Sequence, residues 1–381
     1  MRLPQCEPRR VALVGPTAKH GGGIADHTVE LASRLAAAGL LVEHAGWGRL
    51  FPVRFVPNAV SKREIRAFRE EKARATGAID HSRTNELHWD RPASWVRTGS
   101  RLAAAADELH LVVSSPLQLP AIQAITSAFR RHARTQPRVA LIIHNVVPHE
   151  SRPWDRRLMR KILRLADRVV THSGPEADTA RLLGAKHVVR TVLPLHPPHG
   201  IRPSEHPAGD TQLRRLGFFG LVREYKGVSN LIEAVSRTRN VSLVVQGEFW
   251  EPVEKYAVQI REIGLSARVE LRPGFAPPEI IAKFFSEVDA VVLPYLSSTA
   301  TQQPRLAFLR GVPVIVTDVG DLAEQVRHEV DGLIVSEPSP DALASAIQHF
   351  YTGDTSLRLR RGVRRPDVDS EWDAYLAALL G

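Results

Sequence analysis

Two cationic side chains, Arg223 and Lys226, have the type and spacing of a diphosphate clamp. They lie three residues apart, follow an apolar run that ends at Gly220, and come just before Gly227. An arginine guanidinium grips a phosphate through its planar fork, whereas a lysine ammonium acts as a point charge. Charge on a solvated surface is the alternative interpretation of this pair.

A polar segment at 298–304 offers hydroxyl and amide groups to the same kind of ligand. Ser298, Thr301, Gln302 and Gln303 follow a short apolar run and precede a helical pattern. Such groups at the start of a helix suit sugar hydroxyls and phosphate oxygens. An ordinary helix cap explains Thr301 almost equally well.

A run of glycines at 21–23 indicates that the backbone approaches a ligand closely. Gly22 and Gly23 stand between an apolar run and a helical pattern, and no G-x-G-x-x-G dinucleotide fingerprint is present. Bare backbone N–H groups at a helix start favour negative charge. We expect a phosphate or sugar contact here, with a plain flexible loop as the alternative.

His144 ends another apolar run, and a histidine at that place can position or polarise a substrate oxygen. A hydrogen-bonded structural histidine is the alternative. His149 and Glu150 follow closely, but their spacing from His144 matches no zinc motif. We therefore expect no metal and no cofactor.

Alternating strands and helices must position these residues. Short apolar runs predict buried parallel strands, and apolar residues at helical spacing predict the helices between them. Residues 48–100 predict irregular structure apart from a basic helix near 61–74. Strands are expected at 11–15, 40–44, 109–114, 139–144, 168–173, 188–193, 216–219, 241–246, 269–271, 290–294, 314–317 and 333–335. Helices are expected at 26–38, 120–132, 155–166, 176–183, 228–238, 252–263, 278–287, 302–310, 321–328 and 340–351.

The alternation is interrupted at 194–212 by five prolines and two glycines, which indicate an exposed linker. It predicts an α/β protein with two Rossmann-like domains, at 1–195 and 213–365, joined by a linker at 196–212. Ligands bind at the carboxyl ends of strands in open parallel sheets. We therefore expect the site in a cleft across which the two parallel sheets face each other.

The charge of the chain is unevenly distributed between its two halves. The 381 residues carry a formal net charge of +10, yet residues 1–200 hold 31 Lys and Arg against 17 Asp and Glu. The two basic stretches are at 62–74 and 152–168. A solvated surface and an anionic membrane surface both explain this charge. Nucleic acid is unlikely as a partner, because no aromatic residues alternate with the charges and no DNA-binding motif is present.

Composition excludes several classes of protein. With 43% hydrophobic and 24% charged residues the chain is neither disordered, collagenous nor a coiled coil. The single cysteine, Cys6, excludes an intramolecular disulfide framework and a multi-cysteine zinc site. No apolar run approaches the ~20 residues of a membrane span, and 1–10 is polar. We expect a cytoplasmic protein, with peripheral attachment to the inner face of the membrane as the hypothesis raised by its basic half.

Taken together, these motifs resemble the family 4 glycosyltransferases, which have the GT-B fold. The resemblance spans nearly the whole chain and depends on the order and spacing of six pieces. These are Gly21-Gly22-Gly23-Ile24, the segment from His144 to Glu150, Ala166 to Ser173, Gly220 to Gly227, Gly311-Val312-Pro313-Val314-Ile315, and Asp331-Gly332-Leu333-Ile334-Val335.

The resemblance implies a retaining, hexosyltransferase-like enzyme that moves a sugar from a nucleotide-diphosphate sugar to an acceptor. The implied donor domain is the C-terminal one, and the acceptor, a lipid-linked or envelope glycan, lies on the N-terminal one. Arg223 and Lys226 would stabilise the leaving diphosphate, and His144 would face the donor sugar. Further donor contacts are implied for Gly22, Gly23, Gly247 and Phe275. Residues 366–381 would form a last helix that crosses back to the N-terminal domain.

One departure from the family pattern opens an alternative. The family commonly carries two glutamates spaced E-x7-E, and here Ser298 and Leu306 occupy their positions. The first glutamate usually faces the donor sugar and the second the nucleotide ribose. Ser298 can still bond a sugar hydroxyl, whereas Leu306 has no polar group. A catalytically silent GT-B protein that binds a nucleotide or glycan is therefore the alternative.

Overall fold

A computed structural model describes residues 9–17, 20, 23–50, 86–133, 136–148, 152–196 and 214–381. Within these ranges the chain divides into two compact units. Unit 1 contains the described residues up to Val192 together with Trp372–Gly381, and unit 2 contains Leu193–Glu371. The expected basic helix near 61–74 and most of the expected linker, 197–212, lie outside the described residues.

Unit 1 is built on a seven-stranded parallel sheet in the order β3-β2-β1-β4-β5-β6-β7. Strands such as β4 (ELHLVV) are buried along their whole length, as expected for a parallel sheet covered on both faces. The strands are β1 Arg10–Gly15, β2 Leu41–Arg49, β3 Leu87–His88, β4 Glu108–Val113, β5 Arg138–Ile143, β6 Arg168–Thr171 and β7 Val188–Arg190. The helices are α1 Gly23–Ala37, α3 Pro92–Ala105, α4 Leu119–His132, α5 Asp155–Leu163 and α6 Gly174–Leu182, with the short 3-10 helix η4 Pro116–Gln118.

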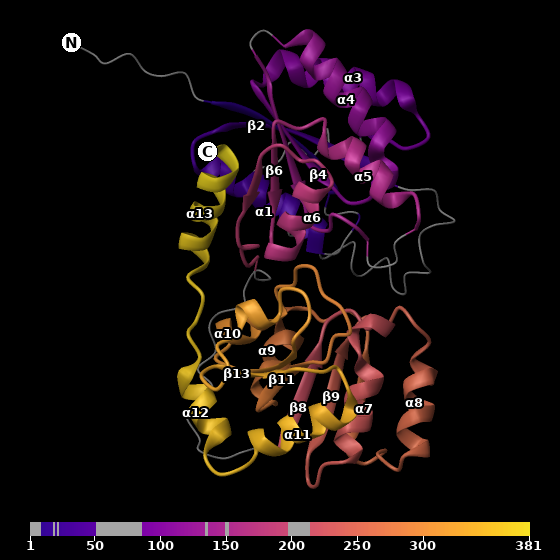
Figure 1. Ribbon diagram of the computed structural model, residues 1–381, viewed down its shortest axis with the longest axis vertical. Coiled ribbons are helices and arrows are strands. Elements are labelled where there is room, and N and C mark those ends of the chain that lie inside the picture. Colours follow the sequence, from indigo (N-terminus) through magenta and orange to yellow (C-terminus); the bar gives the residue numbers. More distant parts are fainter. Residues whose placement is uncertain are drawn as a thin grey trace, which may run out of the picture. The chain divides into compact units, whose positions relative to one another are not determined.

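Unit 2 repeats the plan with six parallel strands in the order β10-β9-β8-β11-β12-β13. Both sheets have the doubly wound order, in which strand order reverses beside the first strand of the unit. The strands are β8 Arg215–Phe219, β9 Ser242–Gly247, β10 Val269–Pro273, β11 Ala290–Leu293, β12 Val314–Thr317 and β13 Gly332–Val335. The helices are α7 Val228–Ser236, α8 Val253–Glu262, α9 Pro278–Ser286, α10 Gln303–Leu309, α11 Pro340–Phe350 and α12 Thr355–Gly362, with 3-10 helices η5 Glu224–Lys226 and η6 Ala323–Gln325 (Figure 1).

The expected alternation of strands and helices is confirmed, with the following differences. The short strand β3 forms within 48–100, where irregular structure was expected. Residues 92–105 form α3 instead of irregular structure, although Thr98, Gly99 and Ser100 weaken the helical signal. Gly99 is explained by packing, because a Cβ there would lie 2.6 Å from the carbonyl oxygen of Ile125 in α4. The helix expected at 321–328 is wrong: only the single turn η6 forms. Helix α12 was not expected.

The last helix, α13 Val368–Leu380, joins unit 1 from Trp372 onward. Trp372, Tyr375 and Leu379 are buried there. Arg168 donates to the carbonyl oxygens of Ala378 and Leu379 at 3.3 and 3.0 Å. Cations at the last carbonyls of a helix also complement its dipole.

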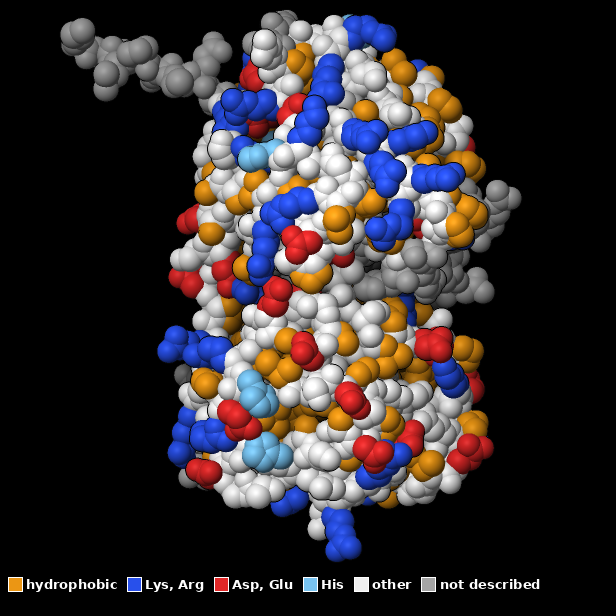
Figure 2. Space-filling view, viewed as in Figure 1, with side chains coloured by type: hydrophobic (Ala, Val, Ile, Leu, Met, Phe, Trp, Pro, Cys, Tyr) orange, Lys and Arg blue, Asp and Glu red, His pale blue; other side chains and the backbone are white. Residues whose placement is uncertain are grey.

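Basic side chains gather on unit 1 in the space-filling view, whereas both signs are mixed on unit 2 (Figure 2). Helix α5 contributes an exposed basic row, made of Arg156, Arg157, Arg160 and Lys161. Among the described residues, no helix is both long and apolar enough to cross a membrane.

The left-handed turn at Gly227 gives a first testable prediction. Gly227 has φ +67°, and a Cβ there would fall on the carbonyl oxygen of Pro294. Gly227→Ala should therefore lower the free energy of unfolding by at least about 3 kcal/mol, from left-handed strain plus overlap. Gly353→Ala is the matched control, because Gly353 has φ +58° with open space around it. It should lose only about 1–2 kcal/mol. Equal losses in urea denaturation would contradict the packing argument.

Candidate functional site

In unit 2, the loops that follow β8, β9 and β10 bring three glycines together at the carboxyl edge of the sheet. Gly220 N–H donates to the Gln246 carbonyl at 3.0 Å, and Gly274 N–H donates to the Gly247 carbonyl at 2.9 Å. A Cβ on Gly247 would overlap the carbonyl of Gly220, so this approach requires glycine. The edge therefore presents bare backbone to a ligand, with the half-buried Phe275 beside Gly274.

Arg223 precedes the turn η5 and Lys226 is its last residue, and each lies against an aromatic ring at this same edge. The Arg223 guanidinium carbon lies 3.5 Å from the ring centre of Trp250, and Lys226 Nζ lies 3.5 Å from that of Tyr295. Such cation–π contacts hold a cation in place without neutralising it. Arg223 Nε is buried and has no hydrogen-bond partner among the described residues. An unpartnered buried N–H of this kind is suited to an anionic acceptor.

The pKa of the Lys226 ammonium is lowered to about 7, mainly by burial, and the nearby positive charge of Arg223 contributes to this lowering. The negative charge of Asp321 acts in the opposite direction and raises it. Near neutral pH, Lys226 is thus poised between its charged and neutral forms. A bound diphosphate would supply the missing negative charge and favour the charged form.

Asp321 follows β12 and holds the polar segment in place. Its carboxylate accepts hydrogen bonds from Ser298 Oγ at 2.8 Å, from the Thr301 backbone N–H at 3.1 Å and from Gln325 Nε2 at 2.7 Å. Burial raises the pKa of Asp321, and these hydrogen bonds oppose that rise. One carboxylate therefore fixes the 298–301 segment and places negative charge near Lys226.

The two glutamines of the polar segment differ in what they contact. Gln302 Nε2 donates to the carbonyl of Pro194 at 2.6 Å, so this N–H already has a hydrogen-bond acceptor in unit 2. Gln303 points toward Gly220: its Nε2 is 3.1 Å from where a Cβ on that glycine would lie. Gln303 Oε1 is buried and has no hydrogen-bond partner among the described residues. Leu306 packs in the hydrophobic core of unit 2.

In unit 1, Gly23 and His144 lie at the carboxyl edge of the sheet, while Gly22 lies outside the described residues. His144 directly follows β5 and is buried against two further histidines. Its ring centre is 5.0 Å from that of His27 in α1 and 4.7 Å from that of His172 after β6. Burial lowers the pKa of His172 to about 3, so this ring stays neutral at physiological pH.

Among the described residues, these three histidines also form a group that could hold a metal. One nitrogen from each lies within 4.8 Å of the others, which is the donor set of a three-histidine zinc site. The cluster also has a packing role. His27 Nε2 is 3.0 Å from the Tyr375 hydroxyl, and its ring stacks on Trp372 at 5.4 Å. The histidines thus help to attach α13 to unit 1.

Sequence reasoning missed Asp321, Trp250, Tyr295, His27 and His172. A signal for Asp321 was present, because it comes four residues after the strand at 314–317, where side chains of a parallel sheet meet ligands. Trp250 and Tyr295 also follow expected strands, at 241–246 and 290–294, but nothing in the sequence pairs their rings with the two cations.

The sequence of unit 2 is similar to that of known sugar-transferring enzymes. Residues 214–352 match the family described as "Glycosyl transferases group 1". The D-inositol 3-phosphate glycosyltransferase of Jonesia denitrificans is 28% identical over 187 residues, covering 46% of this chain and 42% of that relative. That of Streptomyces griseus is 25% identical over 401 aligned positions, covering 90% of this chain and 82% of the relative. The chain spans under half the length of the first curated relatives that it matches.

A solved structure extends the likeness of fold to both units. The Anabaena protein Alr3699/HepE, in complex with UDP, matches with a TM-score of 0.70 at 16% identity over 98% of this chain and 99% of that one. Its likeness, together with the two doubly wound sheets, shows the GT-B fold. The resemblance to the family 4 glycosyltransferases is thereby confirmed: this chain has the GT-B fold and carries a group 1 glycosyl transferase sequence at 214–352.

Proposed function

We propose that this chain is a retaining glycosyltransferase that moves a sugar from a nucleotide-diphosphate sugar to an acceptor. The observation that carries the proposal is the pair Arg223 and Lys226, held against aromatic rings at the carboxyl edge of the sheet. A diphosphate would accept a hydrogen bond from the buried, unpartnered N–H of Arg223. Its negative charge would also favour the charged form of Lys226, whose pKa is about 7. The HepE structure, with UDP bound, supports a nucleotide as the donor carrier.

In this proposal the bond between the sugar carbon and the diphosphate oxygen breaks while the acceptor oxygen bonds to the same face of that carbon. The acceptor proton passes to the leaving phosphate, so no protein base and no metal are needed. Arg223 and Lys226 stabilise the negative charge that develops on the leaving oxygen. Gly247, Phe275, Ser298, Thr301 and Gln303 of unit 2 contribute donor contacts. For Gly23 and His144 of unit 1, contact with the donor is what the family resemblance implies.

The missing glutamates keep the silent GT-B protein as the second candidate. Leu306 is buried in the core, where it offers a ribose nothing polar, and Ser298 Oγ already donates to Asp321. In the catalytic proposal, Asp321 supplies the negative charge that the missing glutamates would otherwise provide near Ser298. In the silent alternative, the same site binds a nucleotide or glycan without turnover.

A nucleotide panel followed by clamp variants tests the proposal. UDP, GDP, ADP, TDP and CMP are compared by thermal shift without metal, because a ligand at 100 times its Kd adds about 2.7 kcal/mol of stability. The matching sugar nucleotides are then assayed for transfer. Arg223→Ala and Lys226→Ala should each lower turnover at least about tenfold, as one charged contact contributes ~1.5–3 kcal/mol. Nucleotide binding without transfer to any acceptor would favour the silent alternative, and unchanged turnover in both variants would refute the clamp.

The pKa of Lys226 predicts how nucleotide affinity depends on pH. Above pH 7, Lys226 is mostly neutral in the free protein and must take up a proton when a diphosphate binds. Affinity for the nucleotide found above should therefore fall as pH rises, by up to about tenfold per unit. Lys226→Ala should abolish this fall. Asp321→Asn should move its onset to lower pH, because it removes the charge that raises the Lys226 pKa.

The control for that variant is Asp318→Asn, which changes an exposed carboxylate three residues away. In this control, nucleotide affinity measured by calorimetry should depend on pH as it does in the wild type. An Asp321→Asn profile that coincides with the wild type would show that Asp321 does not govern the charge of Lys226.

We further propose that unit 1 docks on an anionic membrane surface at the inner face of the membrane, where a lipid-linked or envelope glycan acceptor would be presented. Helix α5 exposes its basic row, and the preceding Trp154 is 49% exposed. The neighbouring turn η4 contacts α5 and exposes Leu117. A basic surface with an exposed aromatic ring suits the headgroup region of a bilayer.

Vesicle flotation tests this docking surface. A triple variant, R156Q/R157Q/R160Q, should bind anionic vesicles at least about tenfold more weakly, since each basic residue contributes on the order of 1 kcal/mol. The matched control R239Q/R261Q/R364Q removes three exposed arginines from unit 2 and should bind as the wild type does. Wild-type binding no stronger to anionic than to neutral vesicles would refute the proposal.

A further inference from the structure

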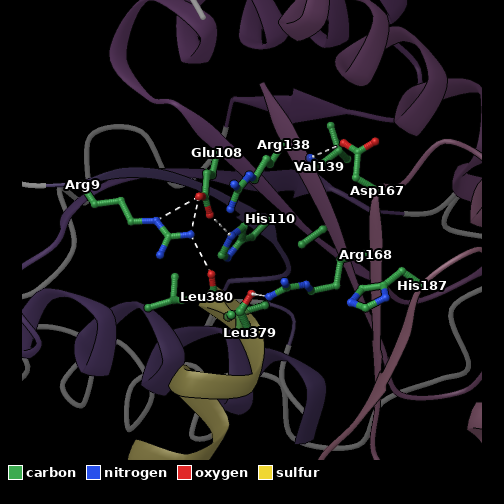
Figure 3. Close-up of a pocket in the computed structure, with 12 residues that line it drawn as sticks. Arg9, Glu108, His110, Arg138, Val139, Asp167, Arg168, His187, Leu379 and Leu380 are labelled. Carbon is green, nitrogen blue, oxygen red and sulfur yellow. Dashed lines mark hydrogen bonds and ion pairs between the residues drawn. The ribbon is translucent and has the colours of Figure 1, made fainter. Parts of the chain in front are cut away.

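Unit 1 has a polar cavity at the edge of the sheet opposite to His144 and Gly23. Its volume is about 300 Å³, and the starts of β4, β5 and β6 line it together with the end of α13 (Figure 3). Arg138 begins β5 at this cavity, whereas His144 follows the other end of the same strand. The cavity is therefore separate from the candidate site described above.

The two acidic side chains of this cavity already have cationic partners. Glu108 forms an ion pair with Arg9, whose guanidinium also donates to the Leu380 carbonyl at 2.8 Å. Asp167 accepts two hydrogen bonds from Arg130, both at 3.1 Å, and one from the Val139 backbone N–H at 2.9 Å. Neither acid is therefore left to balance the remaining basic groups of the cavity.

Three basic side chains of the cavity have no carboxylate partner among the described residues. Among the described residues, the Arg168 guanidinium donates only to the carbonyl oxygens at the end of α13. The side chains of Arg138 and His187 form no hydrogen bond or ion pair with the part of the chain that the structure describes. The terminal carboxylate of Gly381, which also lines the cavity, sets one negative charge against the guanidinium groups of Arg138 and Arg168, so positive charge remains and favours an anion.

His110 adds a hydrogen-bond acceptor to the cavity, which an anion without a hydrogen to donate cannot use. It lines the cavity, is 1% exposed, and its Nε2 lies 3.3 Å from Glu108. A carboxylate only accepts, so Nε2–H is the donor in this contact. Burial lowers the pKa of His110, which keeps the ring neutral and leaves Nδ1 as a lone-pair acceptor. Nδ1 is buried and has no hydrogen-bond partner among the described residues.

We propose that this cavity is a binding site for an oxyanion that also carries a hydroxyl hydrogen, namely hydrogen phosphate or a hydroxylated phosphate monoester. The phosphate oxygens would accept from Arg138 and Arg168, with His187 at the rim. The hydroxyl would donate to His110 Nδ1. Because Arg168 also holds the last carbonyls of α13, the ligand would connect the starts of the strands to the end of that helix.

Calorimetry with inorganic phosphate, glycerol 3-phosphate and sulfate tests the site at pH 7.5 and matched ionic strength. The double variant Arg223→Ala/Lys226→Ala is used throughout, because it lacks both competing cations of the diphosphate clamp. Sulfate resembles phosphate in shape and charge but has no hydroxyl hydrogen at this pH. We expect it to bind at least about tenfold more weakly than phosphate. Equal binding of the two anions would overturn the assignment to His110.

Arg138→Gln is the decisive variant, since Arg138 is exposed and no described residue depends on its side chain. It should weaken phosphate binding at least about tenfold. Arg131→Gln, which removes an exposed arginine of α4 outside the cavity, should have no effect. Tighter binding of glycerol 3-phosphate than of phosphate would identify a monoester as the ligand, and the reverse order would identify free phosphate. Absence of binding, or equal binding by both variants, would overturn the proposal.

Discussion

The candidate site depends on one constraint: a lysine ammonium is buried away from water. Lys226 is held against Tyr295, with a second cation, Arg223, close enough to lower its pKa further. Two cations in a poorly solvated place are unfavourable unless negative charge is nearby. Asp321 supplies part of that charge, and the site remains suited to an anionic ligand that supplies more. The diphosphate affinity that we propose for this site would follow from the incomplete charge balance of the protein itself.

Other features of unit 2 keep this arrangement rigid. The carboxylate of Asp321 holds Ser298 and Thr301 from the segment before α10, so one acid both orders that loop and balances charge. Gly220 and Gly247 let two loops meet backbone to backbone, which leaves peptide groups uncovered by side chains. Preorganised donors of this kind stabilise developing charge without reorganising at the moment of reaction.

Unit 1 uses neutral polar groups in its interior. The three histidines at the carboxyl edge are packed with Trp372 and Tyr375 of α13, and burial keeps His172 uncharged. At the opposite edge, Arg9 and Arg168 hold the last carbonyls of the same helix. The final helix is therefore fixed at both ends of the sheet, by aromatic packing at one and by guanidinium groups at the other.

The sequence by itself determined the two doubly wound sheets, because strands buried on both faces read as continuous apolar runs whatever lies beside them. It also located Arg223, Lys226 and the 298–303 segment, since such residues follow strand ends. Helix α3 was not predicted because Gly99 weakens the helical pattern of the sequence. The reason for a glycine there is its close contact with α4, which only the folded structure shows. The pairing of Asp321 with Ser298, and of the two cations with Trp250 and Tyr295, was decided by tertiary structure alone. These partners come from different loops, and only the folded sheet edge brings them within the few ångströms over which hydrogen bonds and ring contacts act.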